Sequence, residues 1–311
     1  MRTAAKRRAI QWANEAVNVS VLLVILLLLA LGCYAMWDSK RVYQAAHAAR
    51  YEIYKPSAEK GELSFRQLQT LNPEVFAWLT VYGTHIDYPV TQGPDNMKYV
   101  NTNAHGDYSL SGAIFLDSGC NRDFTGFPSI LYGHHMEKNT MFGEIGNFAE
   151  KSTFDARQYG MLYYGGQEHG LEFFAFLRAD AYDGSVFRTQ LGQGARQAYL
   201  NLLLSRALYT RSVGVTAQDR IVLLSTCSAS ATNGRDILAA RITDERYDNP
   251  FKTNETDKKG SALAVDGLPG LWTRIPLWGQ VLVLVLPPLL LRFLALTIMK
   301  KRRSHEKRNH A

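Results

Sequence analysis

Cysteine is scarce in this chain, with three residues, Cys33, Cys120 and Cys227, among 311. Small exported domains that rely on disulfides contain many more, which excludes a disulfide scaffold. Because Cys33 lies in a long apolar run, at most one disulfide, between Cys120 and Cys227, is possible elsewhere. Histidine, cysteine and acidic residues do not cluster with the spacing of metal ligands. We therefore expect neither a metal site nor a cofactor.

A net positive charge is also absent outside the two ends of the chain. The formal net charge is +7, and basic residues in the first eight and last twelve positions more than account for it. The segment between them is slightly acidic by formal count, which argues against nucleic-acid binding. Basic residues beside apolar runs follow the positive-inside rule, which places both termini in the cytoplasm.

Two long apolar runs lie next to these basic ends. Residues 17–37 carry no charge and are long enough to cross a bilayer as a helix. Residues 275–299 form a second run, which contains Pro287-Pro288 and, near its end, Arg292. The first run is longer than the core of a cleaved signal peptide and lacks a small-x-small exit, and it lacks most of a lipoprotein cleavage box. We therefore expect it to be an uncleaved anchor.

The runs and tails divide the chain into seven predicted segments. The domain between the two spans, with its stalk and linker, is expected outside the membrane. The segments are a cytoplasmic basic tail (1–16), a transmembrane helix (17–37), a stalk (38–61), the main folded domain (62–245), a linker (246–274), a second transmembrane helix (275–299) and a second cytoplasmic basic tail (300–311).

The folded domain contains many short β-branched and aliphatic segments separated by Gly, Asn, Asp and Pro. This pattern predicts a mainly β fold with added helices, built as a closed or nearly closed β-barrel. One clear helix is expected at 193–207, where Leu202, Leu203 and Ala207 recur at helical spacing. The expected strands are residues 75–81, 86–90, 113–116, 130–132, 161–164, 171–177, 221–226 and 237–242.

The strand 221–226 places Cys227 at its carboxyl end, and Arg235 follows eight positions later, after a polar loop. A nucleophilic cysteine needs a stabilised thiolate and a group that meets the charge on the attacked carbonyl oxygen. A cysteine at a strand end is otherwise an inert small hydrophobe. Since few thiols lie outside the predicted membrane span, the catalytic interpretation is favoured.

A second strand, 130–132, ends at Gly133, and His134 and His135 follow at once. A thiol nucleophile needs a partner that passes a proton to the leaving group, and a histidine at a neighbouring strand end can supply it. The alternatives are two surface histidines or half of a metal site. Adjacent histidines point in different directions, and no ligand cluster accompanies them.

Several ordered motifs of the folded domain, at plausible spacings, match one known family. They are Asn72-Pro73-Glu74-Val75-Phe76-Ala77-Trp78-Leu79, Ile86-Asp87-Tyr88-Pro89-Val90-Thr91-Gln92-Gly93, Asp95-Asn96 with Tyr99, Ser111-Gly112-Ala113-Ile114-Phe115-Leu116-Asp117, Tyr132-Gly133-His134-His135-Met136, Thr140-Met141-Phe142-Gly143, and Leu224-Ser225-Thr226-Cys227 with Arg235. These residues resemble the class B sortases, and the resemblance covers about residues 62–245. The helix before the cysteine strand also resembles the extra helix of class B.

The resemblance implies a cysteine transpeptidase on a sortase-type β-barrel in the cell envelope of a Gram-positive bacterium. It gives Cys227 the role of nucleophile, His134 that of acid/base, and Arg235 that of the group that binds the substrate backbone and the oxyanion. The substrate-binding residues it implies are Ser225, Thr226, Asn96 and Tyr99.

The loop 228–234 departs from the common class B pattern. It lacks the acidic residue often found beside the cysteine and is slightly short, so Arg241 stands as an alternative to Arg235. Arg235 is preferred because residues 237–242 then match the strand that follows.

The resemblance implies cleavage of a C-terminal sorting signal after Thr through a thioacyl intermediate, which is then joined to an amine. The second span and basic tail resemble sortases that polymerise pilins, which favours a pilin as substrate and a pilin lysine as acceptor. The alternative within the family is anchoring of a surface protein to a peptidoglycan cross-bridge amine. An exported cysteine protease, with water as acceptor, is the alternative from another class. The expected partners are these proteins, the amine and the membrane, with no nucleic acid.

Overall fold

The computed structural model describes residues 2–56, 63–228 and 231–251. These residues belong to two units, one that ends at Arg41 and one that begins at Val42. The predicted second span 275–299, the tail 300–311 and most of the linker 246–274 lie outside the described residues.

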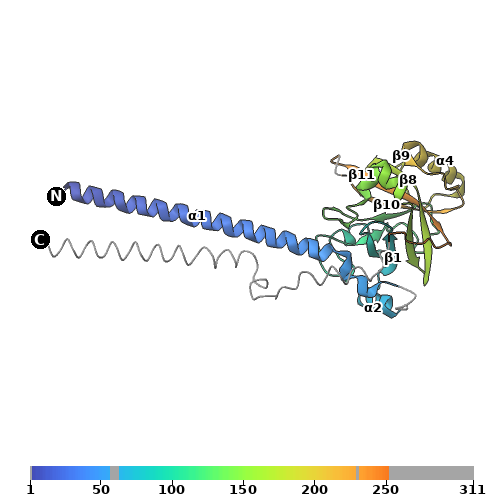
Figure 1. Cartoon of the computed structure of the whole chain (residues 1–311), viewed down its shortest axis with the longest axis horizontal. Coiled ribbons are helices and arrows are strands. Elements are labelled where there is room, and N and C mark those ends of the chain that lie inside the picture. The colour runs from blue at the N-terminus through green and yellow to red at the C-terminus, as the bar shows by residue number, and fades with distance from the viewer. Residues whose placement is uncertain (1, 57–62, 229–230, 252–311) are drawn as a thin grey trace. The chain divides into compact units, whose positions relative to one another are not determined.

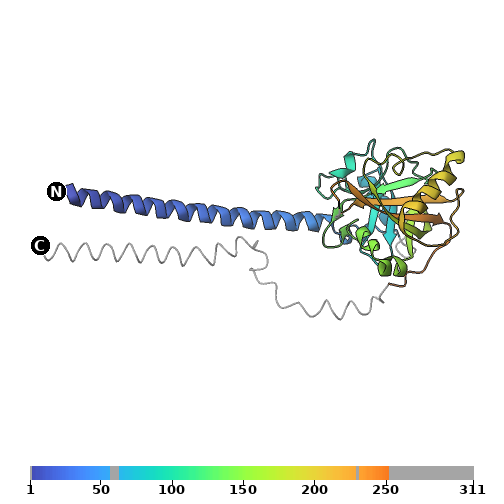
Figure 2. The same ribbon diagram turned by 90° about the horizontal axis from the view of Figure 1, so that it is seen from above.

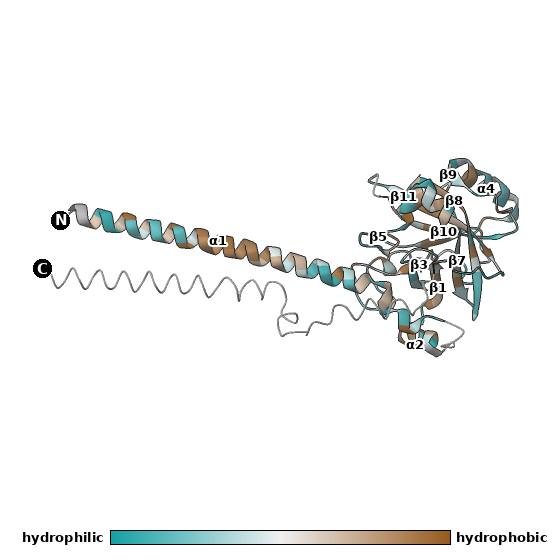
Figure 3. Ribbon diagram, viewed as in Figure 1, coloured by the Kyte–Doolittle hydropathy of each residue, from teal (hydrophilic) through white to brown (hydrophobic). Residues whose placement is uncertain are grey.

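The first helix, α1 (Arg2–Ala46), is continuous through the predicted tail, the predicted span 17–37 and the start of the predicted stalk. It contains no proline, which explains why the helix continues across these changes in polarity. Its apolar residues are concentrated in its middle part (Figure 3). Among the described residues, it is the one helix long and apolar enough to cross a membrane.

The unit that begins at Val42 is built on one sheet, which has nine strands among the described residues (Figures 1 and 2). Its order is β11-β10-β4-β3-β2-β1-β7-β8-β9, and pairing of β11 with β8 closes eight of these strands into a barrel. The strands are β1 (Val75–Val81), β2 (Asp87–Thr91), β3 (Ile114–Leu116), β4 (Ser129–Tyr132), β7 (Tyr159–Tyr164), β8 (Gln167–Asp180), β9 (Ala207–Thr210), β10 (Arg220–Cys227) and β11 (Gly234–Thr243).

The predicted mainly β fold with added helices is confirmed, and each of the eight predicted strands is present. The predicted helix 193–207 is α4, and β9 begins where it ends. Sequence patterns did not reveal β9, α3 or the β5–β6 hairpin, whose strands of two residues each are too short for a periodic signal. The remaining elements are α2 (Leu63–Leu71), β5 (His135–Met136), β6 (Thr140–Met141), α3 (Lys151–Ala156), α4 (Gln193–Arg206), and the 3₁₀ turns η1 (Ala48–Arg50), η2 (Glu52–Tyr54), η3 (Lys98–Val100) and η4 (Ile145–Ala149).

The two faces of the barrel wall pack into two different hydrophobic cores. On β10, Val222 and Leu224 point into the barrel, whereas Leu223 points outward into a second core. α4 covers this outer core with Leu200 and Leu203. Burial of each such side chain stabilises the fold by about 1.5–3 kcal/mol. The outer face of β10 is therefore held rigid up to the point where the strand leaves the core.

Residues 42–56, here called the docked segment, pack on the barrel instead of forming a free stalk. Ala46 and Tyr51 are buried, with 1% and 4% of their surface exposed. Tyr51 stacks on His105 with 5.0 Å between ring centroids, and Lys55 forms an ion pair with Asp87. The predicted stalk is therefore wrong for these residues: their apolar side chains gain more from burial than from exposure to water.

Candidate active site

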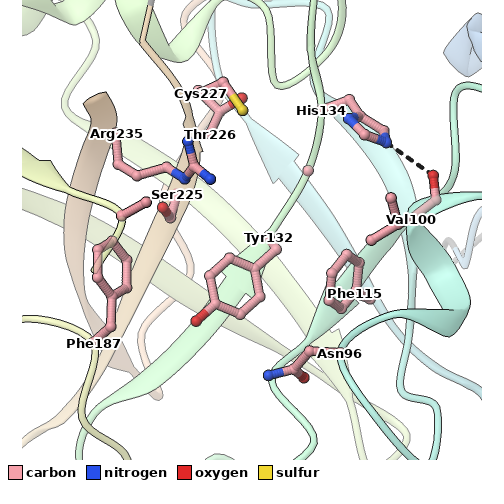
Figure 4. Close-up of a pocket in the computed structure, with 12 residues that line it drawn as sticks. Asn96, Val100, Phe115, Tyr132, His134, Phe187, Ser225, Thr226, Cys227 and Arg235 are labelled. Atoms are coloured by element: carbon pink, nitrogen blue, oxygen red, sulfur yellow. Dashed lines mark hydrogen bonds between the residues drawn. The ribbon is translucent and has the colours of Figure 1, made fainter. Parts of the chain in front are cut away.

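A pocket of about 370 Å³ opens at the edge of the sheet where β4 and β10 end and β11 begins. Of the seven residues predicted to form the site, six line it and Tyr99 does not. Its lining residues are Asn96, Val100, Phe115, Tyr132, Gly133, His134, Ala181, Phe187, Ser225, Thr226, Cys227 and Arg235 (Figure 4).

Cys227 and Arg235 are paired directly across the antiparallel strands β10 and β11. Partners in such a pair project from the same face, with Cβ atoms about 4.5–5.5 Å apart. Cys227 is exposed at the strand end, and it is a free thiol. The Arg235 guanidinium donates to the Gly234 carbonyl at 3.2 Å, and no carboxylate pairs with it among the described residues. It is therefore available to a ligand in the pocket.

The alternative arginine, Arg241, lies far from the pocket. It pairs with Ile221, six residues back along β10, which corresponds to roughly 20 Å. Its guanidinium forms an ion pair with Glu172 at 2.6 Å. The structure thus brings Arg235, and not Arg241, to the cysteine.

His134 reaches the same end of the sheet because β4 runs parallel to β10. Parallel strands end at the same edge, and Tyr132 is in register with Ser225. The Gly133 N–H donates to the Ser225 carbonyl at 3.2 Å, which ties the residue before His134 to the cysteine strand. His134 and Cys227 thus meet at the mouth of the pocket (Figure 4).

A backbone carbonyl sets the orientation of the His134 ring. Nε2 lies 2.8 Å from the carbonyl oxygen of Val100. Because a carbonyl oxygen only accepts, Nε2 carries the proton and donates it. Figure 4 shows Nδ1 on the side of the ring that faces Cys227. In the neutral ring Nδ1 is therefore the nitrogen with a free lone pair, on the side where the thiol lies.

Gly112 allows the Val100 carbonyl to occupy this place. It has φ +58°, and a Cβ at this position would lie 2.6 Å from the Val100 oxygen and 2.4 Å from the Tyr99 oxygen. Both separations are too short for any side chain, so only glycine fits here.

The four predicted substrate-binding residues differ in their surroundings. The hydroxyls of Ser225 and Thr226 are buried and have no hydrogen-bond partner among the described residues. The Asn96 amide is already used: it donates to Asp117 at 2.8 Å and accepts from the Ser118 N–H at 2.7 Å. Buried polar atoms without partners are rare, so Ser225 and Thr226 are the better candidates for ligand contact.

Tyr99 is turned into the core, away from the pocket. It is fully buried, and its hydroxyl donates to Glu74 at 2.6 Å and accepts from the Asn72 amide at 2.9 Å. Tyr99 stands in the motif that predicted it as a site residue, but its side chain packs behind the turn that carries Val100.

The pocket walls include side chains that the sequence patterns did not reveal. Phe115 and Tyr132 are paired on neighbouring strands, and the position of Tyr132 at the end of β4 could have suggested it. Ala181 and Phe187 come from the loop between β8 and α4, which carries no periodic signal. Burial and the neighbouring Asp117 raise the pKa of Tyr132, and its hydroxyl donates to that carboxylate at 3.1 Å.

The second cysteine of this unit, Cys120, has the opposite environment. It is buried and donates weakly to the Pro128 carbonyl at 3.7 Å. Burial raises the pKa of its thiol to about 11. Both Cys120 and Cys227 are free, so the one disulfide that the sequence permitted is not formed.

No family model matches the chain. It is 29% identical to sortase B of Listeria monocytogenes over 180 residues, which are 57% of this chain and 73% of that protein. It is 43% identical to the solved structure of sortase B from the type II pilus of Streptococcus pneumoniae, with a TM-score of 0.51, covering 61% of this chain and all of that one. A Streptococcus pyogenes class B sortase involved in pilus biogenesis is 38% identical, with a TM-score of 0.53, covering 57% of this chain and 97% of that one.

A closed eight-stranded barrel whose end carries a cysteine, a histidine and an arginine around one pocket is the arrangement of a sortase. Identity of 38–43% over nearly the whole length of two solved sortases narrows this further. The chain belongs to the class B sortases, which are cysteine transpeptidases.

Proposed function

We propose that Cys227 is the nucleophile, His134 the acid/base and Arg235 the oxyanion-binding group of this transpeptidase. The observation that carries the proposal is that all three side chains line one pocket, from the ends of three neighbouring strands. The His134 ring takes the proton of the Cys227 thiol, and the sulfur attacks the carbonyl carbon of the Thr residue in a sorting signal. The carbonyl π electrons move to the oxygen, and the Arg235 guanidinium stabilises the negative charge.

His134 then completes the exchange of acyl groups. Its ring gives a proton to the departing amine as the C–N bond breaks, and a thioester remains on Cys227. An incoming amine attacks the thioester carbonyl, loses a proton to the ring, and displaces the thiolate. The buried hydroxyls of Ser225 and Thr226 bind the peptide backbone of the sorting signal.

The substrate we propose is a pilin, with a pilin lysine as the amine acceptor. The support is that the relatives with 43% and 38% identity are a sortase from a type II pilus and one involved in pilus biogenesis. Anchoring of a surface protein to peptidoglycan uses the same chemistry with a different amine. The acceptor therefore decides between the two.

A competition assay tests this choice. The full chain is incubated with a fluorescent sorting-signal peptide and equal concentrations of a pilin-derived lysine peptide and a cross-bridge-type amine peptide, and the products are separated by mass. Pilin polymerisation predicts an isopeptide to the lysine as the main product. A main product with the cross-bridge amine supports wall anchoring, and release of free acid alone supports a protease.

We also propose that the apolar run 275–299 forms a second membrane span, so that both termini lie in the cytoplasm. The support is its length and its basic flank. An epitope tag placed after Ala311 should be protected from protease in intact spheroplasts and cut after lysis. Cleavage in intact spheroplasts contradicts the second span.

A further inference from the structure

The buried side chain of Tyr88 joins the docked segment to the part of the barrel that carries His134. The Tyr88 hydroxyl donates to the carbonyl oxygen of Ala46 at 2.9 Å. The Tyr88 hydroxyl oxygen also accepts the N–H of Met141 at 2.9 Å. One buried hydroxyl therefore connects the end of α1 to strand β6 of the β5–β6 hairpin.

This double role needs a neutral hydroxyl in a fixed place. Only 2% of Tyr88 is exposed, and burial raises the pKa of its side chain to about 12. The phenol therefore keeps its proton and can donate and accept at the same time. Phenylalanine would fill the same volume but could do neither.

The hairpin continues the connection to His134. In register, His135 lies opposite Met141, and the next N–H, that of Phe142, donates to the backbone carbonyl of His134 at 3.0 Å. Met141 has φ +51°, a backbone conformation that a residue with a side chain keeps only when its surroundings hold it. The Tyr88 hydroxyl is a partner that holds this residue.

The docked segment also contacts the two elements that support His134, the hairpin and the loop after Val100. Lys138, at the tip of the hairpin, places its ammonium 4.4 Å from the ring centroid of Tyr43. Tyr51 and Tyr54 both contact the ring of His105, in the loop between η3 and β3. That loop begins just after Val100, whose carbonyl accepts from the His134 ring. Both supports of His134, the hairpin and the Val100 turn, thus touch the docked segment.

We propose that Tyr88 is a positioning residue for His134, and that through it the docked segment next to the membrane anchor keeps the acid/base in place. The proposal rests on the role of His134 proposed above. It implies that the fully active enzyme requires the chain that joins the anchor to the barrel, in addition to the barrel itself.

The test uses the full chain in lipid nanodiscs with the substitution Tyr88→Phe. We expect the amide of Met141 to exchange its hydrogen faster. We expect kcat for transfer of a sorting-signal peptide to an amine to fall roughly ten- to hundredfold, since small displacements of a reacting group have effects of this size. KM for the peptide and the rate at which a small methanethiosulfonate modifies Cys227 should stay within about twofold, because peptide pocket and thiol are unchanged.

Tyr164→Phe is the matched control. Tyr164 is also buried, and its hydroxyl accepts from Arg220 at 2.6 Å, at the end of β10 opposite to Cys227. This variant should leave kcat and Met141 exchange unchanged. Equal losses of kcat in both tyrosine variants would show general destabilisation and overturn the proposal, as would faster exchange at Met141 with unchanged kcat.

A milder pair of variants tests the same connection without removing a buried group. Lys138→Met retains the length of the side chain but removes the cation over Tyr43, and it should lower kcat severalfold, whereas Lys138→Arg should restore it. Equal kcat in the two variants contradicts the proposal. If His134 is not the acid/base, His134→Ala leaves the transfer activity intact. This result distinguishes failure of the proposed function from failure of the proposed role of Tyr88.

Discussion

Cys227 and Arg235 face each other as the last paired residues of the β10–β11 ladder. Their side chains share the outer face of the barrel, where Leu223 and Ile237 of the same strands belong to the core beneath α4. The thiol and the guanidinium are therefore placed by strand register, and a loop that differs from the common class B pattern can lie between them without separating them.

This pairing predicts that Arg235 acts on the chemical step. Arg235→Ala should lower kcat by about 10²–10³, the usual effect of removing an oxyanion donor, and Arg235→Lys should recover only part of it because the planar fork is lost. Arg241→Ala, which breaks the ion pair with Glu172, should leave kcat unchanged and cost on the order of 1 kcal/mol of stability. Steady-state transfer kinetics measure kcat, and thermal unfolding measures the stability. A larger loss of kcat in Arg241→Ala than in Arg235→Ala contradicts the assignment of Arg235.

The two thiols of the barrel unit should differ sharply in reactivity. Cys227 is exposed, whereas Cys120 is buried and its pKa is about 11. Near neutral pH almost no Cys120 is thiolate, so a charged methanethiosulfonate should modify Cys227 first and leave Cys120 unmodified in the folded protein. Peptide mapping by mass spectrometry after a short exposure gives the answer. Modification of Cys120 at a comparable rate would contradict the described burial.

Gly112→Ala should damage both stability and catalysis. A Cβ would lie 2.4–2.6 Å from two carbonyl oxygens, so the Val100 carbonyl must move away from the His134 ring. We expect the free energy of unfolding to fall by about 2 kcal/mol or more, with a tenfold or larger loss of kcat. Denaturant unfolding and transfer kinetics provide the two values.

Gly106→Ala is the control for this change. Gly106 lies in the same loop with φ +94°, but a Cβ there meets no atom within 4 Å. It should cost stability through its backbone conformation alone and leave kcat unaltered. Equal kcat losses at the two glycines would mean that the Val100 carbonyl has no special role.

Ser225→Ala should weaken substrate binding without cost to the fold. The Ser225 hydroxyl is buried without a partner among the described residues, so its removal should change the free energy of unfolding by less than about 0.5 kcal/mol. Loss of one hydrogen bond to the peptide should raise KM roughly two- to tenfold. Ser129→Ala, at an equally buried hydroxyl without a described partner and outside the pocket, should leave KM unchanged. A shift of KM in the Ser129 variant alone would reverse this interpretation.

The sequence predicted the site residues that lie at strand ends. It did not predict the backbone carbonyl that orients His134 or the buried orientation of Tyr99. Cys227, His134 and Arg235 follow or end short apolar strands, so periodicity placed all three near one edge of the sheet. The Val100 carbonyl that orients His134 could not be predicted, because every residue has a carbonyl. Tyr99 has the spacing of a site residue, but its ring is buried and its hydroxyl is bound to Glu74.

The docked segment was misjudged for a related reason. Residues 38–60 are mostly polar, and a polar, helix-compatible stretch after an apolar run is typical of a stalk. Its few contacts, such as Ala46 with Tyr88 and Tyr51 with His105, depend on partners more than forty positions away in the chain. Local composition contains no information about such partners.

The most direct measurement is the intact mass of the full chain after incubation with a sorting-signal peptide, followed by addition of an amine. We expect a covalent adduct on Cys227 with the mass of the peptide up to its Thr. Addition of the amine should then remove it and yield an amide product, and Cys227→Ala should form no adduct. An adduct that persists in the Cys227→Ala variant, or transfer activity without any thioester on Cys227, would contradict a cysteine transpeptidase that works through this residue.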